Sequence, residues 1–551
     1  MDLNNFPPFK NHFKGEIGFF SMRPSSPIMT PKESIEGIYR KKDGEHVIET
    51  RFGDNPKVWD VPVVELLEGF EGKGVRLKVE PSPQGEALYE NMDWNTVPVN
   101  EVDPRYTQCS KEGRERFLDM KFGMMVHWGI YSQLGIPESW PANATRCDPE
   151  FLDVYYTLWQ VFNPTEFSGD EWADLAERAG MQFFQLTTKH HDGFCMFDTQ
   201  TKTWARRRTR NMGPGVGNVE DAFIHYSIMD TPYKAYCQRH GKDPDIISEV
   251  IKAFRERGMG IGLYFSHIDW NDPNFRWDKA NRSFDPSYGP ETHPDQWQAF
   301  IQREKTQLVE LFTKYGRIDQ VFFDGTWFGL EMDAMVDIIL TCRDLQPDCM
   351  FSDRGIGPYG DFTSPERWIP SSSEDDRLKH RATWQVCDPI HTSWAYLPDD
   401  AYKKKSVLLK NFVDAISKGG TYVFAIAPDH RGKFPAKTVE ILEFMGDWLK
   451  KNGDAIYRSR PWKKHKEEGM DVYFTKTKDG KRVHLITFES DGGTIKVSGI
   501  KPPREGVVSC LENGKLARWT MLGDILEIEI PSEASLPLQD GLAITFSVDL
   551  Q

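Results

Sequence analysis

The stretch that decides the fold is Gly316–Trp327, GRIDQVFFDGTW. Its apolar centre, Val321 to Phe323, is typical of a strand buried between two packed layers. The apolar run stops at Asp324, and Gly325 allows the backbone to turn. A carboxylate at the carboxyl end of a barrel strand is typical of a catalytic residue, but Asp-Gly pairs also cap ordinary turns. Both roles are open for Asp324 from this stretch alone.

Helix-like and strand-like segments alternate on both sides of this stretch, between residues 110 and 452. The segment 168–180 has an N-cap at Ser168 and a stop at Gly180, and so predicts a helix. Apolar strand-like runs include GMMVHW (123–128), FFQLTTKHH (183–191), MGIGLYFSHIDW (259–270), CMFSDRG (349–355) and TYVFAIAPD (421–429). Repeated units of this kind predict an α/β fold with a TIM-type (β/α)8-like barrel. A doubly wound open sheet is the alternative, but no glycine-rich phosphate loop accompanies the pattern.

The pattern differs at both ends of the chain. Residues 1–105 predict a small β-rich region and linker, with a hairpin in 36–54 and a further strand in 75–86. From residue 455, short alternating strands separated by Asp-Gly, Gly-Gly and Asn-Gly turns predict a C-terminal β-sandwich. The expected domains are therefore 1–105, a catalytic barrel at 106–454 and a β-sandwich at 455–551, with an irregular insertion at 205–245.

Composition excludes several classes of protein. The net charge of -15 argues against a nucleic-acid partner, and no apolar run is long enough to span a membrane. The eight cysteines form no CxxC or zinc-type spacing, which favours free thiols and no metal. The N-terminus lacks a basic segment followed by an apolar one. We therefore expect a cytoplasmic protein if Met1 is the native start, and an exported one if a signal peptide has been removed; homo-oligomerisation stays open.

Polar residues follow five of the predicted strands at the point where each strand ends. They are His127-Trp128, His190-His191-Asp192, Ser266-His267 with Asp269-Trp270, Asp324, and Asp353-Arg354. In a barrel the carboxyl ends of all strands converge on one face, where active sites lie. One histidine beside a strand is usually a satisfied structural residue, but five polar strand ends together predict a site.

The chemistry of these side chains suits a polyhydroxylated substrate. Imidazole and guanidinium groups bond ring hydroxyls, while indoles stack on the C–H faces of a sugar. A retaining glycosidase needs two carboxylates, one as nucleophile and one as general acid/base. Asp324 is the candidate nucleophile. The loop at 355–374 holds the candidates for the second carboxylate: Glu366, Glu374 and Asp361.

Seven strings of this chain resemble glycoside hydrolase family 29, the retaining α-L-fucosidases. They are KFGMMVHWGIYS, FNPTEFSGDEWADLAERAG, LTTKHHDGFCMFDT, FFDGTWFG, DRGIGPYGDFTSPE, ISKGGTYVFAIAPDHRGKFP and WLKKNGDAIYRSRPW, within residues 115–465. The resemblance implies a barrel followed by a β-sandwich, no metal or other cofactor, and an oligosaccharide or glycoconjugate substrate. It implies Asp324 as nucleophile and Glu366 as acid/base. The sugar-binding residues that it implies are His127, Trp140, His190, His191, Tyr264, Arg354 and Trp394.

The chain departs from the family pattern at three places. Ser139 precedes Trp140 where the family often has a sugar-binding glutamate, and Glu138 is one position away. Phe322 stands where the family often has tryptophan. The family often reads Trp-Glu and Ser-Trp-Gly-Tyr-Asn where this chain has Trp384-Gln385 and 393–397, SWAYL. Those loop aromatics are expected to help to enclose the C5 substituent of the sugar.

Three alternatives to an exo-acting α-L-fucosidase remain. An α-L-galactosidase of the same family differs only in tolerating a hydroxyl at C6, and an apolar pocket discriminates modestly between the two sugars. A metal-dependent barrel hydrolase would need a ligand set such as His-x-His, whereas strand alternation should turn His190 and His191 apart. A non-catalytic sugar-binding barrel would have lost its carboxylates, but Asp324 and Glu366 are both present.

Overall fold

The computed structural model describes the backbone of residues 38–42, 45–50, 59–62, 102–142, 149–209, 219–275, 277–278, 283–284, 290–325, 332–372, 375–378, 383–490, 493–534, 536–539 and 541–550. The chain divides into two compact units, residues 25–94 and residues 1–24 together with 95–551. Within the described ranges, no helix combines the length and the apolar character needed to cross a bilayer. The strand expected at 75–86 lies outside the described residues.

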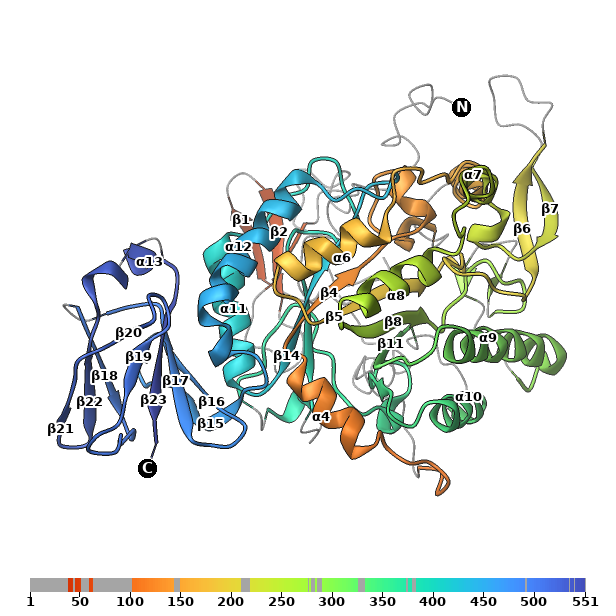
Figure 1. The fold of residues 1–551 in the computed structure, drawn as a ribbon. Helices are drawn as coiled ribbons and strands as arrows, with labels where there is room; N and C mark the ends of the chain where they lie inside the picture. The colour runs from red at the N-terminus through yellow and green to blue at the C-terminus, as the bar shows by residue number, and fades with distance from the viewer. Residues whose placement is uncertain are drawn as a thin grey trace. The chain divides into compact units, whose positions relative to one another are not determined.

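Seven parallel strands form the central sheet of the larger unit, in the spatial order β12-β11-β8-β5-β4-β14-β13 (Figure 1). They are β4 (Phe122–Val126), β5 (Phe183–Lys189), β8 (Gly260–Ser266), β11 (Gln320–Asp324), β12 (Met350–Phe351), β13 (Gln385–Pro389) and β14 (Thr421–Ile426). All seven strands are buried along their whole length, as expected for a sheet covered by helices. The predicted α/β barrel is confirmed.

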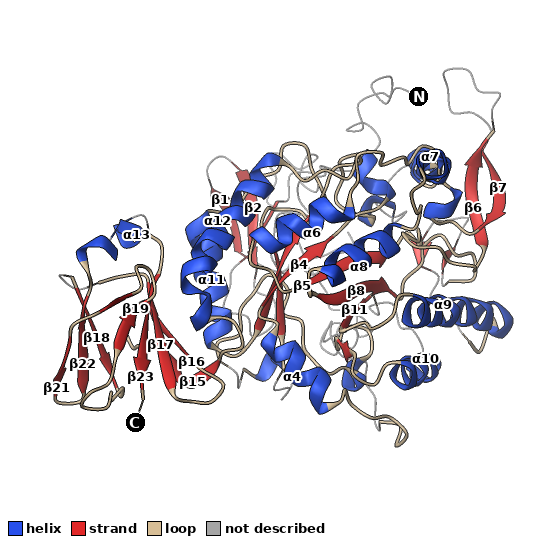
Figure 2. Ribbon diagram, viewed as in Figure 1, coloured by secondary structure: helices blue, strands red, loops and turns tan. Residues whose placement is uncertain are grey.

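Helices surround this sheet, and Figure 2 shows them as a layer outside the strands. They are α4 (Lys111–Asp119), α5 (Pro149–Tyr155), α6 (Gly169–Arg178), α7 (Pro232–His240), α8 (Ile246–Glu256), α9 (Pro294–Lys314), α10 (Met332–Leu345), α11 (Lys405–Ser417) and α12 (Ala436–Asn452). The Ser168 hydroxyl caps α6 by accepting the Glu171 N–H at 3.3 Å, and Gly180 adopts a φ of +74° beyond its end. Both predicted helix boundaries are therefore confirmed.

A short segment, residues 362–366, completes the barrel between β12 and β13. Parallel bridges join Ser352 to Phe362 on one side, and Thr363 to Trp384 and Glu366 to Cys387 on the other. The segment thus occupies the eighth strand position, although it is too irregular to form a named strand. Consequently Glu366 is fixed to the barrel wall by its backbone.

Three buried glutamines from different strands bond one another inside the barrel. The Gln185 amide donates to Gln385 Oε1 at 3.2 Å, and the Gln385 amide donates to Gln320 Oε1 at 3.0 Å. Trp384 immediately precedes β13 and is also buried, and its indole covers Gly420 just before β14. The expectation that Trp384 and Gln385 belong to a loop around the sugar is wrong, because both lie at the amino-terminal end of β13, away from the strand tips.

The insertion expected to be irregular at 205–245 is folded. It contains most of an antiparallel hairpin, β6 (Thr203–Arg208) with β7 (Val219–Ile224), and helix α7. Buried Thr203 and Ala205 alternate with more exposed neighbours in β6, the pattern of a strand with one covered face. The prediction of irregular structure was wrong. Consecutive arginines occupy both faces of β6, so its sequence does not show the alternation of apolar and polar residues that marks a strand.

Two antiparallel sheets form the C-terminal part, in the orders β15-β16-β17-β23-β19-β20 and β18-β22-β21. The strands are β15 (Arg460–Lys466), β16 (Val472–Lys476), β17 (Arg482–Thr487), β18 (Thr494–Ser498), β19 (Val508–Cys510), β20 (Lys515–Leu516), β21 (Trp519–Leu522), β22 (Ile525–Glu529) and β23 (Ile544–Asp549). Residues from both sheets, including Phe474, Leu485, Ile495, Leu526 and Phe546, share one buried core. The predicted β-sandwich is confirmed.

The smaller unit contains a three-stranded antiparallel sheet of β1 (Ile38–Lys42), β2 (Glu45–Thr50) and β3 (Trp59–Pro62). β1 and β2 pair in register from Ile38 with Glu49 to Lys42 with Glu45. The predicted hairpin is confirmed.

Candidate active site

Asp324 is the last residue of β11, and both of its carboxylate oxygens are hydrogen-bonded. Oδ1 accepts Arg354 Nη2 at 2.9 Å, Arg354 Nε at 3.2 Å and the Gly325 N–H at 3.0 Å. Oδ2 accepts the Tyr264 hydroxyl at 2.5 Å, and His191 Nε2 lies 4.0 Å from it. Gly325 has a φ of +91°, so Asp324 both caps the turn and faces a buried cation. The turn-capping role is therefore present in the structure, and the contact with a buried cation is compatible with a catalytic role as well.

The electrostatics around Asp324 favour its ionised form. Burial alone would raise the pKa of this carboxyl, but the Arg354 guanidinium, His191 and the Tyr264 hydrogen bond outweigh that cost. The net effect holds the pKa of Asp324 below its ordinary value. The carboxyl group is therefore ionised throughout the neutral and mildly acidic range, the state that a nucleophilic role would require.

Arg354 joins the two candidate catalytic carboxylates. While Nε and Nη2 contact Asp324, Nη1 donates to Glu366 Oε2 at 2.8 Å. The Arg354 side chain is only 8% exposed, whereas that of Glu366 is 38% exposed. One planar cation thus holds a buried carboxylate and a solvent-accessible one side by side. Solvent access suits a residue that exchanges a proton with a leaving group and with water.

The structure distinguishes Glu366 from Asp361 as the second carboxylate. Asp361 is buried, where it accepts Arg343 Nη2 at 2.6 Å and the N–H groups of Cys109 and Phe351 at 2.8 Å each. These bonds tie Asp361 to the body of the barrel and away from Arg354. Glu374 lies outside the described residues.

Aromatic and imidazole rings surround Asp324 and Arg354. The His127 ring centroid lies 5.2 Å from that of Tyr264 and 5.3 Å from that of Trp394, and the His190 ring is stacked with Tyr264 at 5.6 Å. Trp140 lies 5.1 Å from His191 between the same ring centroids. The structure therefore brings together all nine residues that the sequence nominated, from the ends of β4, β5, β8 and β11 and from the loops that follow.

The three histidines of this wall are neutral. Burial lowers the pKa of His127 to about 3 and of His191 to about 4, and places that of His190 well below its ordinary value. His190 Nδ1 bonds the Ser139 hydroxyl at 2.6 Å, and His191 Nδ1 bonds the Ser266 hydroxyl at 2.7 Å. These bonds fix the orientation of both rings in the wall around Asp324.

The expected separation of His190 and His191 was wrong. Their ring centroids are 4.2 Å apart, and both rings lie in the wall around Asp324. β5 ends at Lys189, so strand alternation no longer applies at the next two residues.

Glu138 is a part of the site whose conformation the sequence did not reveal. It is 3% exposed and adopts a φ of +35°, which is strained for a residue with a side chain. Its Oε1 accepts the N–H groups of Trp394 and Ala395 at 2.9 Å each. Glu138 therefore holds the backbone of the loop that carries Trp394. A positive φ cannot be predicted for glutamate from sequence, although its position beside Ser139-Trp140 was a signal.

Burial of Glu138 has a consequence for stability. Its pKa is raised to about 7, mainly by burial and to a smaller extent by the charge of Glu366, against the opposing effects of Arg367 and the two backbone N–H groups. A folded-state pKa above the unfolded one means that stability is lost as pH rises through the folded-state pKa. We expect Glu138→Gln to remove this loss. On raising the pH from 4.5 to 8, the free energy of unfolding of the variant should therefore increase relative to that of the parent protein by on the order of 3 kcal/mol.

Urea unfolding of both proteins at the two pH values measures this difference. Glu468→Gln, at an exposed position of the C-terminal part, is the matched control and should track the parent protein. An identical pH dependence of Glu138→Gln and the parent protein would contradict the buried, titrating glutamate.

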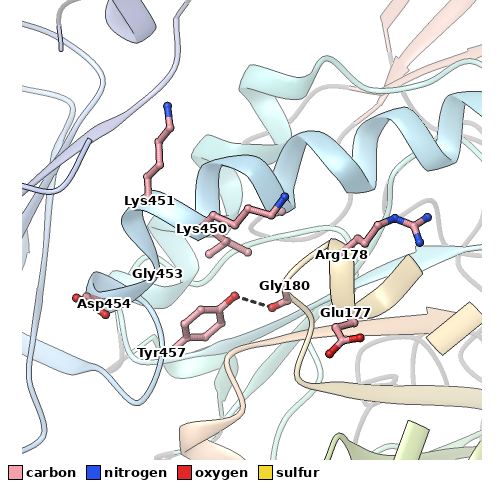
Figure 3. A pocket seen from close by; sticks show the side chains of 10 residues that line it. Glu177, Arg178, Gly180, Lys450, Lys451, Gly453, Asp454 and Tyr457 are labelled. Carbon is pink, nitrogen blue, oxygen red and sulfur yellow. Dashed lines mark hydrogen bonds between the residues drawn. The ribbon is translucent and has the colours of Figure 1, made fainter. Parts of the chain in front are cut away.

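A second cavity, of about 340 Å³, lies where the ends of α6 and α12 meet, away from the strand tips (Figure 3). Its basic side chains are paired: Arg178 with Glu443 at 3.3 Å, Lys450 with Asp447 at 2.8 Å and Lys451 with Glu512 at 2.6 Å. The Tyr457 hydroxyl donates to the Gly180 carbonyl across it at 2.7 Å. These pairings favour a structural role for the cavity at the junction of the two helices. The candidate active site is therefore the one around Asp324.

A parallel barrel whose strand tips hold two carboxylates on one arginine, among histidines and indoles, is the arrangement of a glycoside hydrolase. The family model described as alpha-L-fucosidase matches residues 99–454. The chain therefore belongs to the alpha-L-fucosidase family of glycoside hydrolases.

Relatives across this family are similar over most of their length. Tissue alpha-L-fucosidase of Mus musculus is 25% identical over 76% of this chain and 88% of its own. Plasma alpha-L-fucosidase of Rattus norvegicus is 25% identical over 82% and 96%. Among solved structures, alpha-L-fucosidase isoenzyme 1 of Paenibacillus thiaminolyticus has 25% identity and a TM-score of 0.63, over 80% of this chain and 99% of its own. A trapped covalent intermediate of a GH29 alpha-L-fucosidase from Bacteroides thetaiotaomicron shares the fold, with 22% identity and a TM-score of 0.65 over 83% and 100%.

Proposed function

We propose that the protein removes terminal α-L-fucose from glycans with retention of configuration, using Asp324 as nucleophile and Glu366 as general acid/base. The observation that carries this assignment is the Arg354 guanidinium, which binds Asp324 and Glu366 through different nitrogens. A retaining mechanism requires two carboxyl groups close enough to reach one anomeric centre. Membership of the alpha-L-fucosidase family supports L-fucose as the sugar. The shared contact of both carboxylates with Arg354 supports the retaining mechanism.

In the first half-reaction, Asp324 attacks the anomeric carbon as the bond to the leaving oxygen breaks. Among the described residues, Oδ1 accepts three hydrogen bonds and Oδ2 accepts that of Tyr264, which favours Oδ2 as the attacking oxygen. Glu366 donates its proton to the leaving oxygen. The carboxylate that remains faces Arg354, which stabilises the enzyme while the fucosyl group is attached to Asp324.

In the second half-reaction, Glu366 takes a proton from a water molecule that attacks the same carbon from the opposite face. The bond to Asp324 breaks, and the carboxylate returns to its contacts with Arg354 and Tyr264. Two inversions give α-L-fucose as the first product. Asp324 is a competent leaving group because the same contacts that lower its pKa stabilise the departing anion.

The wall of rings supplies recognition of the sugar. Neutral His127, His190 and His191 can donate to or accept from ring hydroxyls without introducing charge. Trp394 and Tyr264 offer apolar faces to the C–H surface and to the C5 methyl group. Apolar contacts to the C5 methyl group would distinguish L-fucose from L-galactose by about 10- to 200-fold.

A side-by-side assay of aryl α-L-fucoside and aryl α-L-galactoside tests the proposal. We expect kcat/KM to favour the fucoside by about 10- to 200-fold, and proton NMR to show α-L-fucose before mutarotation. A preference for the galactoside would assign the protein to the alternative sugar. The β anomer as first product would overturn the double-displacement mechanism.

A further inference from the structure

The hairpin of β6 and β7 presents an exposed face of unusual composition. The cross-strand pairs Trp204–Phe223 and Arg206–Asp221 alternate with pairs that point the other way, so these four side chains share one face. Trp204 is 48% exposed and Phe223 is 55% exposed, with their ring centroids 5.3 Å apart. Large aromatic residues so exposed, and adjacent to each other, are characteristic of a binding surface.

The topology places this hairpin on the same side of the barrel as the active site. It follows the carboxyl end of β5, as His190 and His191 do, and Figure 1 shows it projecting from the barrel near α7. Its backbone is anchored through Arg206, whose carbonyl accepts Trp159 Nε1 at 2.8 Å, and through Arg208, whose N–H donates to Gln160 Oε1 at 2.7 Å. The hairpin is therefore a fixed part of the rim.

A short chain of contacts links the aromatic pair to the catalytic centre. The Trp204 carbonyl accepts Asn271 Nδ2 at 3.1 Å. Asn271 follows Trp270, whose indole centroid lies 5.3 Å from that of His191 and 5.5 Å from that of Trp140. The backbone of the hairpin is thus joined to the loop after β8, whose Trp270 borders the wall around Asp324.

We propose that this face binds the pyranose rings of the leaving-group glycan, forming an outer subsite of the enzyme. Exposed indole and phenyl rings stack on the C–H faces of sugars, and charged side chains bond their hydroxyls. Arg206 lies 3.6 Å from Asp153 and 3.9 Å from Asp221, so charged groups of both signs lie beside the two rings on this hairpin. This inference rests on the proposed function, because it assigns the surface to the same substrate.

A double variant, Trp204→Ala with Phe223→Ala, tests the subsite with two substrates. The first is an aryl α-L-fucoside, whose leaving group is too short to reach the hairpin. The second is the fucosylated oligosaccharide that the parent enzyme hydrolyses fastest, chosen from α1,2-, α1,3-, α1,4- and α1,6-linked compounds. We expect kcat/KM to fall roughly 5- to 30-fold for the oligosaccharide and to stay within twofold for the aryl fucoside.

The matched control is Arg207→Ala, which removes an exposed side chain from the opposite face of the same hairpin, where Arg207 pairs with Glu220. It should leave both rates within twofold. Equal rates of the double variant and the parent protein on the oligosaccharide would overturn the subsite, as would a change of oligomeric state by size exclusion, which would assign the face to a second copy of the chain. Failure of the parent enzyme on the aryl fucoside would instead overturn the proposed function itself.

Discussion

Asp324→Ala is expected to lower kcat for an aryl α-L-fucoside by about 10⁴-fold or more, while the protein remains folded and still binds fucose. The variant removes the carboxylate that Arg354 and Tyr264 hold at the tip of β11. No covalent intermediate can then form at this position. Arg354 keeps Glu366 as a partner, so the buried cation is not left unpaired.

Azide distinguishes the loss of a nucleophile from general damage to the site. In Asp324→Ala the small anion can occupy the place of the missing carboxylate and attack the anomeric carbon once, which yields β-L-fucosyl azide. Fucose binding by calorimetry and an unchanged near-ultraviolet circular dichroism spectrum serve as controls for folding. Turnover within tenfold of the parent enzyme would show that Asp324 is not the nucleophile.

The strand tip at Asp324 was predictable because its signals are local. An apolar run long enough for one buried strand, followed by Asp-Gly, fixes both the end of β11 and the turn after it. The same logic located His127, His190 and Arg354, since polar residues directly after apolar runs must lie at the carboxyl edge of a parallel sheet. Glu366 came from the family resemblance, since nothing local distinguishes it from Glu374.

The features that escaped prediction depend on non-local geometry. Glu138 reaches the Trp394 loop only because its backbone adopts a φ of +35°, and no composition rule gives that conformation to glutamate. The 362–366 segment pairs on both sides through single bridges, so it shows no strand periodicity. Trp384 was placed in a loop because the strand that follows it, β13, was not predicted: its position is set by its pairing with β14, which the sequence does not display.

Glu366→Ala is expected to affect substrates according to their leaving groups. For an oligosaccharide, whose alcohol must be protonated as it departs, kcat should fall by about 10²- to 10⁴-fold. For a fucoside of an acidic phenol the first half-reaction needs no proton, so the glycosyl-enzyme should accumulate and give a burst of phenol followed by slow turnover. The contrast follows from the proposed roles, in which the solvent-accessible Glu366 donates the proton and Asp324 forms the bond to carbon.

The anomeric configuration of the azide product completes the assignment. In Glu366→Ala, azide attacks the Asp324-linked intermediate after one inversion has already occurred, so the product is α-L-fucosyl azide, opposite to that from Asp324→Ala. The fall of kcat/KM at alkaline pH should also disappear in this variant, because the general acid is gone.

Asp361→Asn is the matched control. It removes a carboxylate of the same chain segment that bonds Arg343 and two backbone N–H groups. It should lower stability without changing the ratio of the oligosaccharide rate to the aryl fucoside rate. Equal rate losses on both substrates in Glu366→Ala, with no azide product, would remove Glu366 from the acid/base role, since a proton donor must matter most where the leaving group is most basic.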